Sequence, residues 1–145
     1  MAATIPNWET MELPLSIPET TVVPDHRQIF MFSAATWNRH HIHYSKDAAV
    51  QEGFADVVVQ RGLLGNFLAR MLTDWIGDGA DVRRLSWRVL RSALPGQRLR
   101  CEGEIVAKRE DGEARYLDCD VRTVNGDGEM VVSGTAVLKM RLQEE

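Results

Sequence analysis

The sequence has little of what marks several large classes of protein. It holds 2 cysteines and 5 prolines in 145 residues, and no apolar run approaches the roughly 18 residues of a membrane span. No lysine or arginine precedes Arg27, so neither a secretory signal nor an Arg-rich transit peptide is visible. We therefore expect a cytoplasmic protein without a membrane partner. A disulfide between Cys101 and Cys119 stays open, but free buried thiols are the expectation.

Positive charge is also in deficit, with 17 Lys and Arg against 21 Asp and Glu and a formal net charge of −4. This balance does not suggest a general nucleic-acid binder. Apolar residues at 44% and charged residues at 26% are ordinary globular values. We expect residues 1–145 to form a single domain, in which the proline-rich residues 1–24 are an extended lead-in.

Local signals predict three helices in the first half of the chain. Asp25 is a suitable N-cap for a helix of about a dozen residues that ends near Trp37. A short helix is expected over residues 46–52, with Gly53 as its stop. Over residues 61–76, apolar residues recur as pairs every four positions, which predicts a long helix enclosed by other structure.

After residue 82 the apolar period changes to two, which is typical of strands with one solvated face. Turn sequences containing Gly separate the alternating segments. The apolar positions of these segments are Leu99, Cys101, Gly103 and Ile105, then Leu117, Cys119, Val121 and Thr123, then Val132, Gly134, Ala136, Leu138 and Met140. We predict an α+β fold in which one long helix precedes a meander of four antiparallel strands.

All four histidines of the chain lie between residues 26 and 43, and three of them are His40, His41 and His43. Histidine exchanges a proton near neutral pH and also ligates metals, so the cluster suggests acid/base chemistry or metal binding. No carboxylate or cysteine stands at a familiar ligand spacing, which disfavours a metal site. We expect His26 and His41 to be solvated.

The segment Phe32-Ser33-Ala34-Ala35-Thr36-Trp37-Asn38-Arg39-His40-His41-Ile42-His43-Tyr44 resembles the hydratase motif of MaoC-like acyl-thioester dehydratases. It is most similar to the branch of mesaconyl-CoA hydratases and mitochondrial hydroxyacyl-thioester dehydratases. The resemblance implies a hotdog fold, an antiparallel sheet wrapped around one long central helix. It also implies enoyl-thioester hydration, or the reverse dehydration, without a metal or redox cofactor.

The resemblance assigns the base to His43 and places Asn38 where the broader family has aspartate. A carboxamide cannot accept a proton as a carboxylate does, so the proton transfers fall to His43. His40 is expected to pack beside the site rather than react. For Asn38, a role as a plain helix stop remains the alternative.

The start of the long helix departs from the family pattern. The family typically has His-Gly there, whereas this chain has Gln60 and Arg61, with Gly62 one position later. Helix N-termini suit developing negative charge, so the Gly62 N–H is the preferred donor to the thioester oxygen, and Arg61 is a further candidate for substrate binding. His41 and Ser45 also replace the Arg and Asp of the family motif.

Six arginines and no acidic residue occupy residues 83–100. Two interpretations stay equally open: a solvated strand face, or a site for the phosphates of coenzyme A, with Arg83, Arg84 and Arg88 as candidates. A nucleic-acid site is disfavoured because Trp87 is the only aromatic residue in this stretch.

The resemblance places the acyl site between two hotdog units. We therefore expect a homodimer, or a hetero-oligomer with another hotdog subunit, acting on an acyl-CoA or acyl-carrier thioester. The alternative is a non-catalytic or acyl-binding subunit. A thioesterase is disfavoured because Asp74, near the far end, is the only acid on the long helix.

Overall fold

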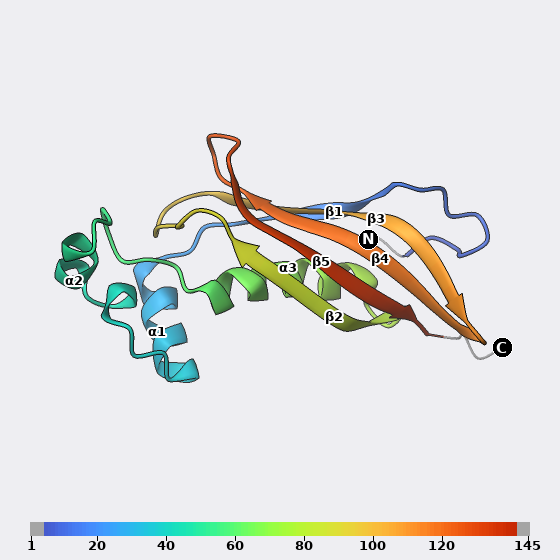
Figure 1. Ribbon diagram of the computed structural model, residues 1–145, viewed down its shortest axis with the longest axis horizontal. Helices are drawn as coiled ribbons and strands as arrows, with labels where there is room; N and C mark the ends of the chain where they lie inside the picture. The colour runs from blue at the N-terminus through green and yellow to red at the C-terminus, as the bar shows by residue number, and fades with distance from the viewer. Residues whose placement is uncertain (1–4, 142–145) are drawn as a thin grey trace.

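The computed structural model describes residues 5–141 (Figure 1). Its elements, in chain order, are β1 (Leu15–Val22), α1 (His26–Thr36), the 3-10 turn η1 (His41–His43), α2 (Lys46–Gln51), α3 (Arg61–Ile76), β2 (Ala80–Val89), β3 (Leu99–Asp111), β4 (Ala114–Val124) and β5 (Met130–Met140). No helix in this part of the chain is long and apolar enough to cross a membrane.

One antiparallel sheet of five strands curves around α3 in the order β1-β3-β4-β5-β2 (Figure 1). The long helix spans the predicted residues, and its apolar pairs are buried as expected for a helix with a broad apolar face. The strand alternation also holds, because Leu99, Cys101, Ile105, Leu117 and Cys119 all face the core. The predicted fold class is therefore confirmed, with α3 as its central helix.

The predicted meander of four strands is wrong in its order. Strands β3, β4 and β5 are consecutive neighbours, but β2 pairs with β5 at one edge, and β1 pairs with β3 at the other. Residues 90–98 cross from β2 to β3 and are fixed by the bonds from Val59 N to Ala93 O and from Gly96 N to Pro24 O. Strands β4 and β5 lie between β2 and β3 in the sheet, so β2 and β3 do not form a hairpin.

The extended lead-in contains strand β1, which the sequence did not reveal. Pro18 lies within it, at a point where the register with β3 shifts between Ile17 and Thr20. Proline is tolerated in edge strands and at bulges, where its missing N–H is not needed. Pro18 interrupts the alternating sequence pattern of β1, although β1 forms one edge of the sheet.

Both cysteines are free and buried. Burial raises the pKa of Cys101, and it raises the pKa of Cys119 to about 12, with Asp118 and Asp120 adding to the effect. Both thiols are therefore protonated at neutral pH and behave as small apolar core residues.

Helices α1 and α2 lie together at one end of the molecule, next to the first turn of α3 (Figure 1). Between them runs the loop that carries the histidine cluster. The fold thus brings the predicted base and the positive end of the central helix to the same end of the molecule.

Candidate active site

Helix α1 begins and ends as its sequence predicts. The Asp25 side chain accepts a hydrogen bond from Gln28 N at 2.7 Å, and the helix ends at Trp37, which is left-handed with φ 56°. The Asn38 N–H then donates to Ser33 O at 3.0 Å. This ending turns the chain sharply into the loop that leads to His43.

The Asn38 side chain shapes that loop. Its Oδ1 accepts a hydrogen bond from His40 N at 3.3 Å, a local turn that asparagine and aspartate both favour. In the described residues the side chains of Asn38 and His43 share no hydrogen bond. The structure places Asn38 on the same loop as the predicted base, five positions before it.

His43 is buried, with 8% of its surface exposed, and its ring is fixed by one strong contact. Nδ1 lies 2.6 Å from Val58 O. A carbonyl oxygen only accepts, so Nδ1 carries the proton, and in the neutral ring Nε2 carries the free lone pair. The tautomer needed for a base acting through Nε2 is thereby set by the backbone.

Burial lowers the pKa of His43 below its ordinary value of 6.5. The hydrogen bond to Val58 acts in the opposite direction, and the nearby His40 lowers the pKa further. The His40 ring stands edge-on to the His43 ring, with centroids 5.7 Å apart, and its Nε2 lies 3.3 Å from Glu52 Oε1. His43 is therefore neutral at pH 7 and available as a proton acceptor.

The segment Asp56 to Gln60, which we call the strap, holds the site together. Asp56 pairs with His26, the first residue of α1, and the distance from Asp56 Oδ2 to His26 Nε2 is 3.0 Å. In the middle of the strap, Val58 donates from its N–H to Ile42 O at 2.9 Å while its carbonyl holds the ring of His43. The strap therefore fixes the histidine loop to α1 and then runs directly into α3.

The first turn of α3 presents Gly62 close to α1. A Cβ at this position would lie 3.2 Å from Cζ of Phe32, so the glycine permits the close approach of α1 to α3. The first N–H groups of a helix have no partner within it, and the N-cap side chain of Gln60 does not supply one. These N–H groups are suited to a developing negative charge.

Arg61 is tied to the sheet. Its Nη2 donates to Trp87 O at 2.9 Å, its guanidinium lies 4.8 Å from the centroid of the Trp87 ring, and Trp87 Nε1 donates to Arg61 O at 3.0 Å. The side chain therefore joins the start of α3 to strand β2. The positive charge of its guanidinium lies at the N-terminus of α3, where it adds to the positive potential of the helix dipole.

The arginines of residues 83–100 do not form one cluster. Arg91 pairs with Glu129 at 3.1 Å, and Arg100 pairs with Glu102. The distance from Arg83 Nη2 to Asp81 Oδ2 is 4.0 Å.

In the described part of the chain Arg84 and Arg88 form no ion pair. These two are therefore the candidates whose positive charge is not compensated.

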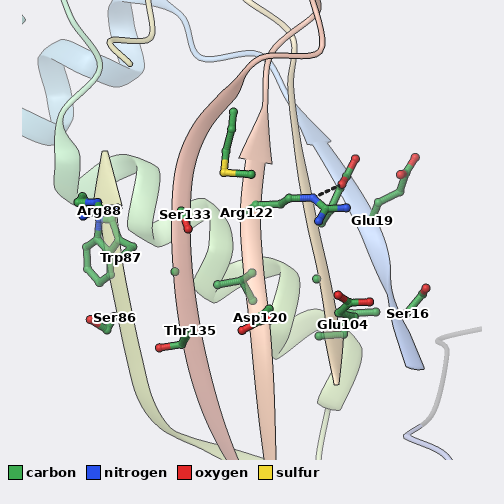
Figure 2. Close-up of a pocket in the computed structure, with 16 residues that line it drawn as sticks. Ser16, Glu19, Ser86, Trp87, Arg88, Glu104, Asp120, Arg122, Ser133 and Thr135 are labelled. Carbon is green, nitrogen blue, oxygen red and sulfur yellow. Dashed lines mark hydrogen bonds and ion pairs between the residues drawn. The ribbon is translucent and has the colours of Figure 1, made fainter. Parts of the chain in front are cut away.

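A hollow of about 960 Å³ lies on the other side of the sheet (Figure 2). It is lined by strand residues, and none comes from α1, the strap or α3. Ser16, Glu104, Asp120, Thr135 and Ser86 form a polar row across the five strands. These side chains point away from α3, so this hollow is distinct from the histidine site.

The residues that fix the ring and the strap were not visible as site residues in the sequence. The acceptor on Val58 is a backbone carbonyl, for which no side-chain signal exists. The Gln60 side chain donates from Nε2 to Ser33 Oγ at 2.8 Å. In the sequence, Gln60 stood out only as a departure from the family pattern, and Ser33 only as part of the motif. In the described residues no three His, Cys, Asp or Glu side chains are grouped as a metal site.

A buried, neutral imidazole with a fixed tautomer near a helix N-terminus can move a proton beside a carbonyl oxygen that gains negative charge. Residues 6–95 match the family described as hydroxyacyl-thioester dehydratase type 2. A mesaconyl-C(4)-CoA hydratase from Chloroflexus aurantiacus is 44% identical over 52 residues, a match that spans 35% of this chain and 19% of that protein.

Solved structures show the same fold. The ChsH1-ChsH2 complex from Mycobacterium tuberculosis contains a chain that is 25% identical, with a TM-score of 0.80 over 91% of this chain and 100% of that one. The R-hydratase PhaJ1 from Pseudomonas aeruginosa is 21% identical, with a TM-score of 0.80 over 94% and 91% of the two chains. A MaoC-like dehydratase from Rhodospirillum rubrum is 16% identical, with a TM-score of 0.83 over 95% and 98%. The fold is thus the predicted hotdog fold, and the chain belongs to the hydroxyacyl-thioester dehydratase type 2 family.

Proposed function

We propose that the protein interconverts an enoyl thioester and a 3-hydroxyacyl thioester, with His43 as the base. The observation that carries this proposal is the hydrogen bond from His43 Nδ1 to Val58 O in a buried setting. It leaves Nε2 as the proton acceptor, and the lowered pKa keeps the ring neutral at pH 7. Family membership supports the same chemistry.

In the hydration direction, Nε2 of His43 takes a proton from water while the water oxygen forms a bond to the β-carbon. The π electrons of the carbon–carbon double bond move toward the thioester oxygen, which gains negative charge. The imidazolium then returns the proton to the α-carbon, and the thioester carbonyl forms again. Dehydration follows the same steps in reverse.

The negative charge on the thioester oxygen requires hydrogen-bond donors. The N–H of Gly62 is our preferred donor, since it lies in the first turn of α3 and belongs to a residue without a side chain. The Arg61 guanidinium, held against Trp87, adds positive potential to this helix end. Asn38 is proposed to hold the attacking water or to shape the loop that does so.

The proposed substrate is a thioester of coenzyme A or of an acyl carrier. Arg84 is the proposed contact for coenzyme A phosphates, and Arg83 is a second candidate, already close to Asp81. Arg88, the third arginine named from the sequence, lines the hollow on the other side of the sheet and is the weakest of the three candidates. Family resemblance places the acyl group between two hotdog units, so the active form is proposed to be a homodimer or a complex with a second hotdog subunit.

The test is hydration of a panel of enoyl-CoA thioesters by the wild type and by His43→Ala. Loss of a general base lowers the rate by about 10²–10⁴-fold, and we expect a loss of this size for His43→Ala. His41→Ala is the matched control, because His41 lies in the same turn but is exposed. Full activity in His43→Ala would disprove the assignment of the base.

A second candidate function is that of a non-catalytic or acyl-binding subunit. The observation that favours it is the start of α3, where Gln60 and Arg61 replace the family's His-Gly and are both engaged by the protein itself. If the purified chain hydrates no thioester alone but does so when mixed with another hotdog subunit, and His43→Ala leaves that activity intact, this candidate replaces the first.

A further inference from the structure

The side chain of Gln60 is completely buried, with 0% of the residue exposed, between α1 and the first turn of α3. Its Nε2 donates two hydrogen bonds, to Ile29 O at 2.6 Å and to Ser33 Oγ at 2.8 Å. Because a backbone carbonyl only accepts, the amino group of the carboxamide must face Ile29. The orientation of the carboxamide is therefore determined by α1.

The two partners of Gln60 lie one helical turn apart on the buried face of α1. The same helix continues through Trp37 into the loop that carries His43. Gln60 itself is the N-cap residue of α3 and the last residue of the strap. Its carboxamide therefore connects the helix that precedes the base to the helix start that supplies the preferred oxyanion donor.

The strap makes this connection short. Val58, which holds the ring of His43, is only two positions before Gln60. A shift of Gln60 relative to α1 would move Val58 O, and with it the imidazole, relative to the first turn of α3. Phe32, which lies against Gly62, belongs to the same buried side of α1 and would move as well.

The oxygen atom of the same carboxamide lies in an unfavourable environment. In the described residues Gln60 Oε1 is buried without a hydrogen-bond partner. A buried acceptor without a partner is unfavourable, and an apolar side chain of similar volume would avoid this penalty. A residue needed only to fill space would not require an amide here, so the two donated bonds to α1 indicate a geometric role.

We propose that Gln60 is a positioning residue, which sets the distance between the His43 imidazole and the N–H groups of the first turn of α3 by fixing α1 to the strap. The inference rests on the proposed function for its kinetic consequence. Gln60 does not touch the substrate, and it acts through Val58 and α1.

The test compares Gln60→Leu, which keeps most of the volume but donates no hydrogen bond, with Gln60→His, which retains a ring N–H donor. We expect kcat of Gln60→Leu to fall by about 10²-fold, since a misplacement of 1 Å costs this much, with a smaller change in KM. Gln60→His should recover a large part of kcat. Ser33→Ala, which removes only one of the two partners, should cause an intermediate loss.

A structural role alone would lower the amount of folded protein without changing the chemistry per folded site. Activities are therefore expressed per folded molecule, and the titration of the His43 ring is followed by NMR in the wild type and in Gln60→Leu. His40 and Glu52, which face this ring, remain in both proteins. We expect the His43 titration midpoint to move toward its ordinary value as the strap loosens.

The NMR measurement does not depend on activity, so it separates this inference from the proposed function. A wild type without hydratase activity, combined with a shifted His43 midpoint in Gln60→Leu, would contradict the function but support the positioning role. An unchanged midpoint, or an unchanged kcat per folded molecule in an active enzyme, would overturn the positioning role.

Discussion

At the scale of single residues, the environment of His43 links the site to the pH dependence of stability. Burial lowers the pKa of this histidine in the folded state, whereas in the unfolded chain it is near 6.5. The unfolded state therefore binds the proton more readily as the pH falls. The contribution of His43 to stability is complete above about pH 6.5 and is lost as the pH falls toward the lowered pKa.

We expect His43→Gln to reduce the loss of stability between pH 7.5 and pH 5, because glutamine does not titrate but can still donate to Val58 O. The measurement is urea unfolding of the variant and the wild type across this range. His41→Gln, in the exposed part of the same turn, is the control. Identical pH dependence in His43→Gln and the wild type would mean that His43 is not desolvated.

Asn38→Asp restores the residue of the broader family. Aspartate can also accept the hydrogen bond from His40 N, so the loop should keep its shape. A carboxylate near the imidazole favours its charged form, so we expect the acid limb of the kcat/KM profile to move to higher pH. Asn7→Asp is a matched control, because Asn7 Oδ1 accepts a similar local bond from Glu9 N. An unchanged profile would place residue 38 outside the group that activates water.

At the scale of elements, α3 and β2 are in close contact through Gly65. A Cβ added at this glycine would lie 2.2 Å from Cζ2 of Trp87, far inside van der Waals contact. We expect Gly65→Ala to reduce the free energy of unfolding by about 1–3 kcal/mol or more, as measured by urea denaturation. Gly126→Ala is the control, because a Cβ there meets nothing within 4 Å. Equal stability of the two variants would disprove the tight packing.

Strand β2 also carries the proposed coenzyme A contact. Arg84→Ala should raise KM for an enoyl-CoA about two- to fivefold, since an exposed ion pair contributes ~0.5–1 kcal/mol. KM for the same acyl group on a short thiol without phosphates should not change. Arg70→Ala, which removes an exposed arginine from α3, is the control for loss of charge. An equal effect on both thioesters would exclude a phosphate contact.

The elements differ in how far the sequence predicts them. Helices α1 and α3 follow from local signals, namely the cap at Asp25, the paired apolar residues and the glycine after Ile76, and the structure matches them within a residue. Strand order is set by contacts between residues distant in the chain, so the position of β2 at the edge of the sheet could not be predicted from local sequence. The motif predicts His43 as the base, but the acceptor that orients its ring, Val58 O, belongs to the backbone and has no residue signature.

At the scale of the whole molecule, the described chain contains one sheet around one central helix. Since the family resemblance places the acyl site between two such units, we expect light scattering to give a mass at least twice the 16.4 kDa of the chain. If the protein purifies alone as a monomer, it should gain that mass with a second hotdog subunit. A monomer that is nonetheless fully active would contradict the shared site.

The geometry of the site also depends on the number of residues in the strap. Its three valines are buried, and its backbone is bonded on one side to the histidine loop and on the other to the connection after β2. One inserted residue between Asp56 and Gln60 would put Val58 and Val59 out of register with their backbone partners and would separate the base from the helix start. The loop at residues 125–128 has no such double attachment, so natural length variation in relatives should be concentrated there and absent from the strap.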